Sequence, residues 1–298
     1  MSDIYERLDT PDLDQPVLVI GLEGWIDAGL GAANAMSALL TGADAETVAT
    51  FDADRLLDHR ARRPIMHLEA GLISGLTWPA TELRAGIDEE GSDLLLLVGA
   101  EPDFEWLAFT EAVVELALDL DCRMAVTLGA YPAPVPHTRD TRLALTTSSV
   151  ELAERLRGYV RGTLDVPAGI HAVLDQALNA QGVPTLGLWA QVPHYVASMP
   201  YPAASVALLD GLTRCSGIVG DRGDLDHEAT ETRARLDQLV AENPQHQSMV
   251  AQLEEIADSE DELSVDESDT LLGEGGLPTG DELAAELQEF LRNRGDDT

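Results

Sequence analysis

The sequence contains no lysine. All 18 of its basic residues are arginine, they stand against 54 acidic residues, and the formal net charge is −36. Without lysine the chain can form neither a Walker A phosphate-binding loop nor a Schiff base on its own side chains. A surface this acidic repels phosphate backbones and anionic lipid headgroups. We therefore expect no nucleic-acid partner and no membrane partner.

Cysteine and long apolar runs are scarce as well. Cys122 and Cys215 are the two cysteines, too few for a disulfide framework, and they are expected to be buried free thiols in a reducing compartment. The longest unbroken apolar run, residues 94–98, is far shorter than a membrane-spanning helix requires. The first residues show no basic region followed by an apolar stretch, which predicts no signal peptide and a cytoplasmic protein.

Sequence motifs for catalysis or metal binding are missing too. No serine lies in a G-x-S-x-G pattern, there is no H-E-x-x-H, and the seven histidines are scattered without ligand spacing. A dinucleotide fingerprint starting at Gly29 would need a glycine where Asn34 stands. The sequence thus predicts no catalytic residues, no metal and no cofactor, and it favours a non-catalytic protein.

Apolar runs typical of strands alternate with segments of helical periodicity through the first 220 residues. The expected strands are 17–22, 47–51, 94–98, 122–128 and 185–190, and the expected helices are 28–40, 105–120, 149–161, 168–180 and 202–214. The stretches 64–81 and 143–147 are expected to supply further strands. Such alternation indicates an α/β fold with a mostly parallel sheet covered by helices on both faces.

The composition changes near Gly220. Residues 221–298 contain 23 acidic residues and five arginines, a net charge of −18 in barely a quarter of the chain. We expect a core domain at 1–220 and an acidic C-terminal extension at 221–298, with helices at about 229–257 and 280–293 joined by a flexible linker at about 258–279. The last of these helices has an apolar stripe, which would dock on its own core or on a partner: Leu283, Leu287, Phe290 and Leu291.

Polar and aromatic side chains gather where three of the expected strands end, which is where ligands bind in open α/β sheets. The candidate ligand- or partner-binding residues are Glu23, Trp25, Asp27, His137, Arg139, Trp189, His194 and Tyr195. Each group also has a structural interpretation. Glu23 and Asp27 suit helix capping and turns, Arg139 suits an ion pair with a carboxylate, and the three aromatic and histidine side chains at 189–195 suit an oligomer interface.

Four segments in register carry a family resemblance. They are Gly24-Trp-Ile-Asp-Ala-Gly29, Gly99-Ala-Glu-Pro-Asp103, Pro136-His-Thr-Arg139 and Leu188-Trp-Ala-Gln-Val-Pro-His-Tyr-Val196. Together they resemble the proteasome assembly chaperone 2 family in its bacterial, actinobacterial-type form, and the segment 280–287 resembles the tail of those members. The resemblance implies a three-layer α/β/α sandwich of the purine nucleoside phosphorylase and peptidyl-tRNA hydrolase type. It also implies homo-oligomers, with trimers expected, and eukaryotic relatives that are non-catalytic chaperones guiding proteasome α-ring assembly.

One departure from the family pattern lies at the end of the chain. Proteasome-docking members end in a hydrophobic residue, a tyrosine and any residue, whereas this sequence ends Arg294-Gly-Asp-Asp-Thr298.

The favoured function is a non-catalytic protein-binding or assembly-chaperone-like factor that acts as a homo-oligomer, with proteasome subunits as a protein partner. The alternative is a nucleoside- or nucleotide-binding protein, or a hydrolase- or phosphorylase-like enzyme, in which Glu23, Asp27, His137 and Arg139 would converge on one pocket.

Overall fold

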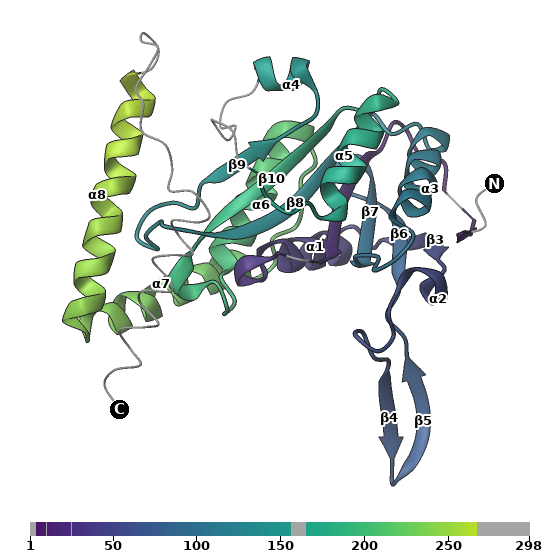
Figure 1. The fold of residues 1–298 in the computed structure, drawn as a ribbon, viewed down its shortest axis with the longest axis horizontal. Helices are drawn as coiled ribbons and strands as arrows, with labels where there is room; N and C mark the ends of the chain where they lie inside the picture. The colour runs from purple at the N-terminus through teal and green to yellow at the C-terminus, as the bar shows by residue number, and fades with distance from the viewer. Residues whose placement is uncertain (1–3, 10, 25, 156–164, 267–298) are drawn as a thin grey trace. The chain divides into compact units, whose positions relative to one another are not determined.

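The computed structural model describes residues 4–9, 11–24, 26–155 and 165–266. Its main feature is an eight-stranded sheet in the order β1-β3-β6-β7-β2-β8-β10-β9 (Figure 1). The strands are β1 (Tyr5–Arg7), β2 (Val17–Glu23), β3 (Glu46–Phe51), β6 (Thr81–Ile87), β7 (Asp93–Ala100), β8 (Met124–Ala133), β9 (Leu143–Thr146) and β10 (Thr185–Pro193).

The four central strands, β7, β2, β8 and β10, are parallel to one another, as the alternation of strands and helices predicts. The outer pairs β1–β3, β3–β6, β6–β7 and β9–β10 are antiparallel. The parallel strands bring their carboxyl ends to one edge of the sheet, so the segments that follow β2, β7, β8 and β10 lie at the same edge.

Helices cover both faces of the sheet. They are α1 (Gly31–Gly42), α2 (Ala53–Leu56), α3 (Trp106–Asp119), α4 (Val150–Arg155), α5 (Ile170–Ala180), α6 (Pro202–Ser216), α7 (Leu225–Ala241) and α8 (Pro244–Asp266), with short 3₁₀ turns η1 (Ala28–Leu30) and η2 (His194–Val196). Val17 and Val19 of β2 pack in one apolar cluster with α1 and α6, and Leu18 and Ile20 pack in a second cluster with α3 and α5. This alternation explains the unbroken apolar run of β2, because both of its faces are buried. The fold is the expected α/β/α arrangement.

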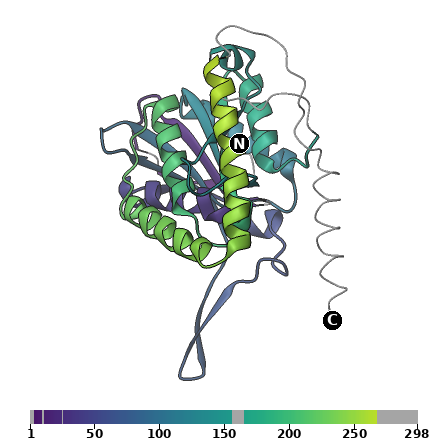
Figure 2. The ribbon, with the colours of Figure 1, turned by 90° about the vertical axis from the view of Figure 1, so that its left-hand side faces the viewer.

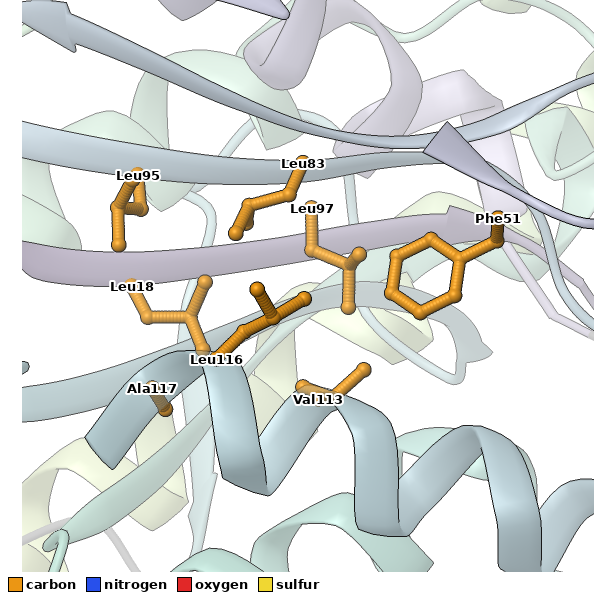
Figure 3. A pocket seen from close by; sticks show the side chains of 8 residues that line it. All are labelled: Leu18, Phe51, Leu83, Leu95, Leu97, Val113, Leu116 and Ala117. Carbon is orange, nitrogen blue, oxygen red and sulfur yellow. The ribbon is translucent and has the colours of Figure 1, made fainter. Parts of the chain in front are cut away.

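Figure 3 shows how α3 fills the second of these clusters. Val113 and Leu116 point from α3 toward Leu18, Leu97 and Phe51 on the sheet. The void that remains between them has a volume of about 10 Å³ and an entirely apolar lining. A space of that size and polarity holds no ligand and offers a water molecule no partner, so it is a packing gap in the core.

The helix expected at 28–40 begins later than the periodicity indicates. Gly29 and Leu30 have positive φ angles of 65° and 54°, so the chain forms the η1 turn and α1 begins only at Gly31. The helix expected at 149–161 is seen as α4, and residues 156–161 lie outside the described part. In the C-terminal extension, the helix expected at about 229–257 is two helices, α7 and α8. Helix α8 runs on through Asp266 into the expected linker, because no glycine or proline interrupts residues 245–266. The helix expected at 280–293, with its apolar stripe, lies outside the described residues.

The stretch 64–81 contains a hairpin of its own and the start of β6. Strands β4 (Ile65–Glu69) and β5 (Leu72–Thr77) form a separate two-stranded antiparallel sheet. Ala70 and Gly71 join them in a two-residue turn with φ angles of 50° and 85°, as the tight turns that match strand twist require. Figures 1 and 2 both show this hairpin extending away from the eight-stranded sheet.

None of the helices in the described ranges is both long enough and apolar enough to cross a bilayer.

Candidate functional site

Asp27 lies just before η1, at the carboxyl edge of the sheet, and caps α1. Its Oδ1 accepts a hydrogen bond of 2.8 Å from the backbone N–H of Ala32, and its Oδ2 accepts one of 2.9 Å from that of Ala33. Burial raises the pKa of this carboxyl group, although those backbone hydrogen bonds act in the opposite direction. The positive end of α1 is therefore occupied by the chain's own carboxylate.

Glu101 closes a second helix N-terminus at the same edge. It follows β7, and its Oε1 accepts a hydrogen bond of 2.7 Å from the backbone N–H of Ile170, the first residue of α5. The backbone N–H of Glu101 in turn donates to the carbonyl oxygen of Glu23, at 2.9 Å. Helix N-termini at this position bind phosphate in many α/β proteins, but here both α1 and α5 direct their amides at internal carboxylates.

Sequence reasoning did not select Glu101 as a site residue. The signal that could have found it is its position, directly after the buried strand β7 and level in the sheet with the end of β2. His171 was missed for a different reason, because it lies near the start of an expected helix, 168–180, and matches no catalytic or ligand spacing. The backbone N–H of Leu22 donates to its Nε2 at 3.3 Å, and burial lowers the pKa of His171 to about 4.

His137 is buried, with 2% of its surface exposed, and it links three parts of the chain. Its backbone N–H donates to the hydroxyl of Tyr195 at 2.8 Å, and its Nδ1 lies 2.7 Å from the same hydroxyl. Its Nε2 lies 3.2 Å from Oδ1 of Asp237 on α7. Burial lowers the pKa of His137, and the nearby carboxylate of Asp237 offsets only part of that shift. Burial raises the pKa of Tyr195 to about 12.

Arg139 and its neighbours bind α8. Nη1 of Arg139 lies 3.1 Å from Oε1 of Glu254, which also accepts a hydrogen bond from the hydroxyl of Thr138. Nη2 of Arg142 donates to the carbonyl oxygen of Ala257 at 2.8 Å. With the contact between His137 and α7, these bonds fasten both extension helices to the loop that follows β8. The ion-pair interpretation of Arg139 is the one that this geometry matches.

Trp189 lies on β10 beside the edge strand β9. Its Nε1–H donates to the hydroxyl of Thr146 at 3.0 Å, and its ring lies directly over Gly129 of β8. Only a glycine at 129 leaves room for the ring, because a Cβ there would overlap the six-membered ring of the indole. The ring of His171 lies edge-on to it, with an interplanar angle of 75° and 6.4 Å between the centroids.

The other predicted residues are placed differently. Glu23 is the exposed last residue of β2, and His194 is exposed on η2 with its ring against that of Tyr195. Trp25 lies outside the described residues. The structure thus brings His137, Tyr195 and His194 together and joins Arg139 to α8. Asp27 instead caps α1, and the backbone carbonyl of Glu23 accepts a hydrogen bond from Glu101.

The polar side chains at the strand ends are held in contacts within the chain. The carboxylates of Asp27 and Glu101 cap helices, and the imidazole of His137 is enclosed by Tyr195 and Asp237. Among the described residues, no group of three histidine, cysteine or carboxylate side chains is placed to hold a metal ion. These contacts join the segments that follow β2, β7 and β8 to the helices α1, α5, α7 and α8.

The hairpin of β4 and β5 offers a surface of another kind. Seven of its large apolar side chains, including Trp78 at its base, are 48–74% exposed: Ile65, Met66, Leu68, Leu72, Ile73, Leu76 and Trp78. Exposed apolar surface gathered in one place marks a site of interaction with another molecule. An isolated two-stranded hairpin is also only marginally stable in water, so a binding partner would stabilise this one.

Comparison with protein families and with solved structures identifies relatives of this chain. The family model described as "PAC2 family" matches residues 21–240. A Mycobacterium tuberculosis protein of unknown function, Rv2714, is 32% identical over 90% of this chain and 93% of its own, with a TM-score of 0.82. A PAC2 family protein from Streptomyces avermitilis is 34% identical over 80% of this chain and 99% of its own, with a TM-score of 0.72.

A third relative carries a functional name. The Mycobacterium tuberculosis proteasome-assembly chaperone homologue Rv2125 is 28% identical over 80% of this chain and 99% of its own, with a TM-score of 0.73. The comparison with curated proteins found no match. Since the family model spans most of the chain and relatives above 30% identity share its fold along nearly their full length, this chain belongs to the PAC2 family.

Proposed function

We propose that this protein is a non-catalytic protein-binding factor of the assembly-chaperone type, which acts as a homo-oligomer in the cytoplasm. The observation that carries the proposal is the exposed apolar hairpin of β4 and β5, which is a surface suited to another protein and not to a small ligand. Membership of the PAC2 family and the similarity to a proteasome-assembly chaperone homologue support the same kind of role.

The partner that the family suggests is the proteasome α-subunit. The surface we assign to it is the carboxyl edge of the sheet, where Glu23 and His194 are exposed. Tyr195 and His137 would hold the η2 segment in place behind them, since their mutual hydrogen bonds fix its position. Trp25 and Trp189 are the further aromatic residues that we propose to contribute to partner binding.

The geometry gives less support to a nucleoside or phosphate site. The two helix N-termini that would bind an anion are occupied by Asp27 and Glu101, and His137 is buried beneath α7. A ligand would have to displace an internal carboxylate before it reached either helix. We therefore favour protein binding over the small-molecule alternative.

Two measurements on the purified full-length protein test this function. Light scattering after gel filtration should give a mass of at least twice 31.9 kDa, the mass of one chain. Binding to purified proteasome α-subunits should be saturable, and Glu23→Ala together with His194→Ala should weaken it. The exposed Glu255→Ala on α8 is the matched control and should bind normally. A monomer that does not bind α-subunits would remove the basis of the proposal.

A further inference from the structure

The hairpin differs from the rest of the chain in its charge. Residues 59–78 contain three arginines and one glutamate, a net charge of +2 in a chain whose total is −36. Arg60 and Arg63 are exposed at its base. Arg62 instead pairs with its own chain. Its Nη1 lies 2.5 Å from Oδ1 of Asp103, and this ion pair joins the hairpin to the loop before α3. The hairpin is thus an apolar arm with a cationic base on an otherwise acidic protein.

Its apolar side chains lie opposite one another. Met66 on β4 pairs with Leu76 on β5, and Leu68 pairs with Ile73. These four side chains are 48–67% exposed. In a sheet of only two strands, cross-strand apolar pairs have no second layer of the same chain to pack on, so their burial requires another surface.

The outer face of α3 combines exposed apolar side chains with an acidic one, which complements the apolar hairpin and its arginines. Leu107 and Leu118 are 75% and 47% exposed, and Glu111 is exposed between them. The spacing 107, 111 and 118 places all three on one face of the helix. Phe104, just before the helix, adds a side chain that is 52% exposed. The helix contains three carboxylates and no basic residue, and Asp119 already pairs with Arg7 of its own chain, so Glu111 is the exposed carboxylate on this face.

We propose that the hairpin of one copy docks on the outer face of α3 of a second copy, with Arg60 and Arg63 at its base facing Glu111 of that helix. This contact would be the one that forms the homo-oligomer, so it rests on the proposed function. A direct contact between two hairpins is disfavoured, because it would bring the arginines of both copies together. The contact joins two different surfaces. It can therefore form twice in a two-fold symmetric dimer, or once between each pair of neighbours in a closed ring.

Cysteine pairs test this contact directly. The double variant Ile73→Cys with Leu107→Cys should form disulfide-linked multimers on mild oxidation, seen as a ladder on a non-reducing gel. Either single variant should remain at the monomer position. The matched control pairs Ile73→Cys with Leu239→Cys on α7, which is 50% exposed, and should form no ladder. The wild-type chain, with Cys122 and Cys215, gives the background.

Charge reversal supplies a second measurement. Arg60→Glu with Arg63→Glu should weaken association by about tenfold at low salt, since like charges would then meet across the contact. The difference should shrink at high salt, where exposed charges are screened. Adding Glu111→Arg to that variant should restore part of the association. Circular dichroism checks that each variant is folded, and all of the altered side chains are exposed.

The outcomes separate this contact from the proposed function. A wild-type chain that is monomeric by light scattering would overturn both the homo-oligomer and the contact. An oligomer whose Ile73–Leu107 variant gives no more linked product than the Leu239 control would overturn the contact alone. Linked dimers from Ile73→Cys by itself would show that hairpins pair with each other and would also overturn it.

Discussion

Nε2 of His137 lies 3.2 Å from Oδ1 of Asp237, so a loop at the end of the central sheet is bonded to a helix of the C-terminal extension. The two residues are 100 positions apart in the chain. His137 is buried, whereas the side chain of Asp237 is 53% exposed. The extension helix α7 therefore covers the imidazole and keeps it from solvent, and the carboxylate satisfies the nitrogen that burial would otherwise leave without a partner.

Stability should fall as the pH drops below 6.5. Burial lowers the pKa of His171 to about 4, and it lowers that of His137 below its ordinary value of 6.5, although Asp237 raises it. The unfolded chain therefore takes up these protons at a higher pH than the folded chain. The free energy of unfolding should decrease between pH 6.5 and 4, by roughly 3 kcal/mol from His171.

Urea unfolding at pH 7.5, 6.5, 5.5 and 4.5 measures this dependence. His171→Gln should flatten the decrease, and His67→Gln, on the exposed hairpin, should leave it as in the wild type. A decrease that is the same in His171→Gln as in the wild type would contradict the assignment.

Asp27→Ala should destabilise the protein by about 1 kcal/mol, the usual cost of losing a side-chain cap. Two backbone N–H groups at the start of α1 would lose their acceptor. Asp27→Asn should cost less, because the amide oxygen still accepts one of the two hydrogen bonds. Glu23→Ala, at an exposed position of the same segment, is the control and should change the free energy of unfolding by less than about 0.5 kcal/mol. Equal effects of Asp27→Ala and Glu23→Ala would rule out the capping role.

Gly129→Ala should destabilise the fold by about 1–3 kcal/mol, because the added methyl group would overlap the ring of Trp189 and force it to shift. The emission spectrum of the tryptophans should change with it. Gly75→Ala on the hairpin is the matched control, since the nearest atom to its Cβ would be 3.9 Å away. If both substitutions had the same small effect, the close contact between Trp189 and β8 would be refuted.

Glu254→Gln should loosen α8 without unfolding the core. The substitution removes the charge that holds Arg139 and weakens the acceptor of Thr138, yet the pair is partly exposed and should contribute less than about 1 kcal/mol. Hydrogen exchange should accelerate in residues 244–257 and 136–142 and stay unchanged in β2 and β7. Glu255→Gln, on the exposed side of the same helix, should exchange like the wild type. Unchanged exchange in Glu254→Gln would mean that apolar packing by Leu253 and Ala257 holds α8.

Much of the core could be predicted from the sequence. Runs such as residues 94–97, which are apolar at every position, form strands buried on both faces, and no tertiary information is needed to recognise them. The four motif segments were enough to indicate the family, which the family model and the solved structures confirm. The start of α1 was predicted too early, because periodicity does not reveal that Leu30 adopts a left-handed conformation.

The sequence by itself determined the acidic character, the absence of lysine chemistry and the alternation that produces an α/β/α core, since these depend on composition and on local periodicity. Only the tertiary structure decided how the polar residues at the strand ends are used. Asp27 and Glu101 cap helices and His137 contacts α7, and each of these roles depends on a partner distant in sequence or on the local path of the backbone. The exposure of the hairpin was likewise decided in three dimensions, because an apolar stretch such as residues 65–78 reads the same in sequence whether its side chains are buried or left in solvent.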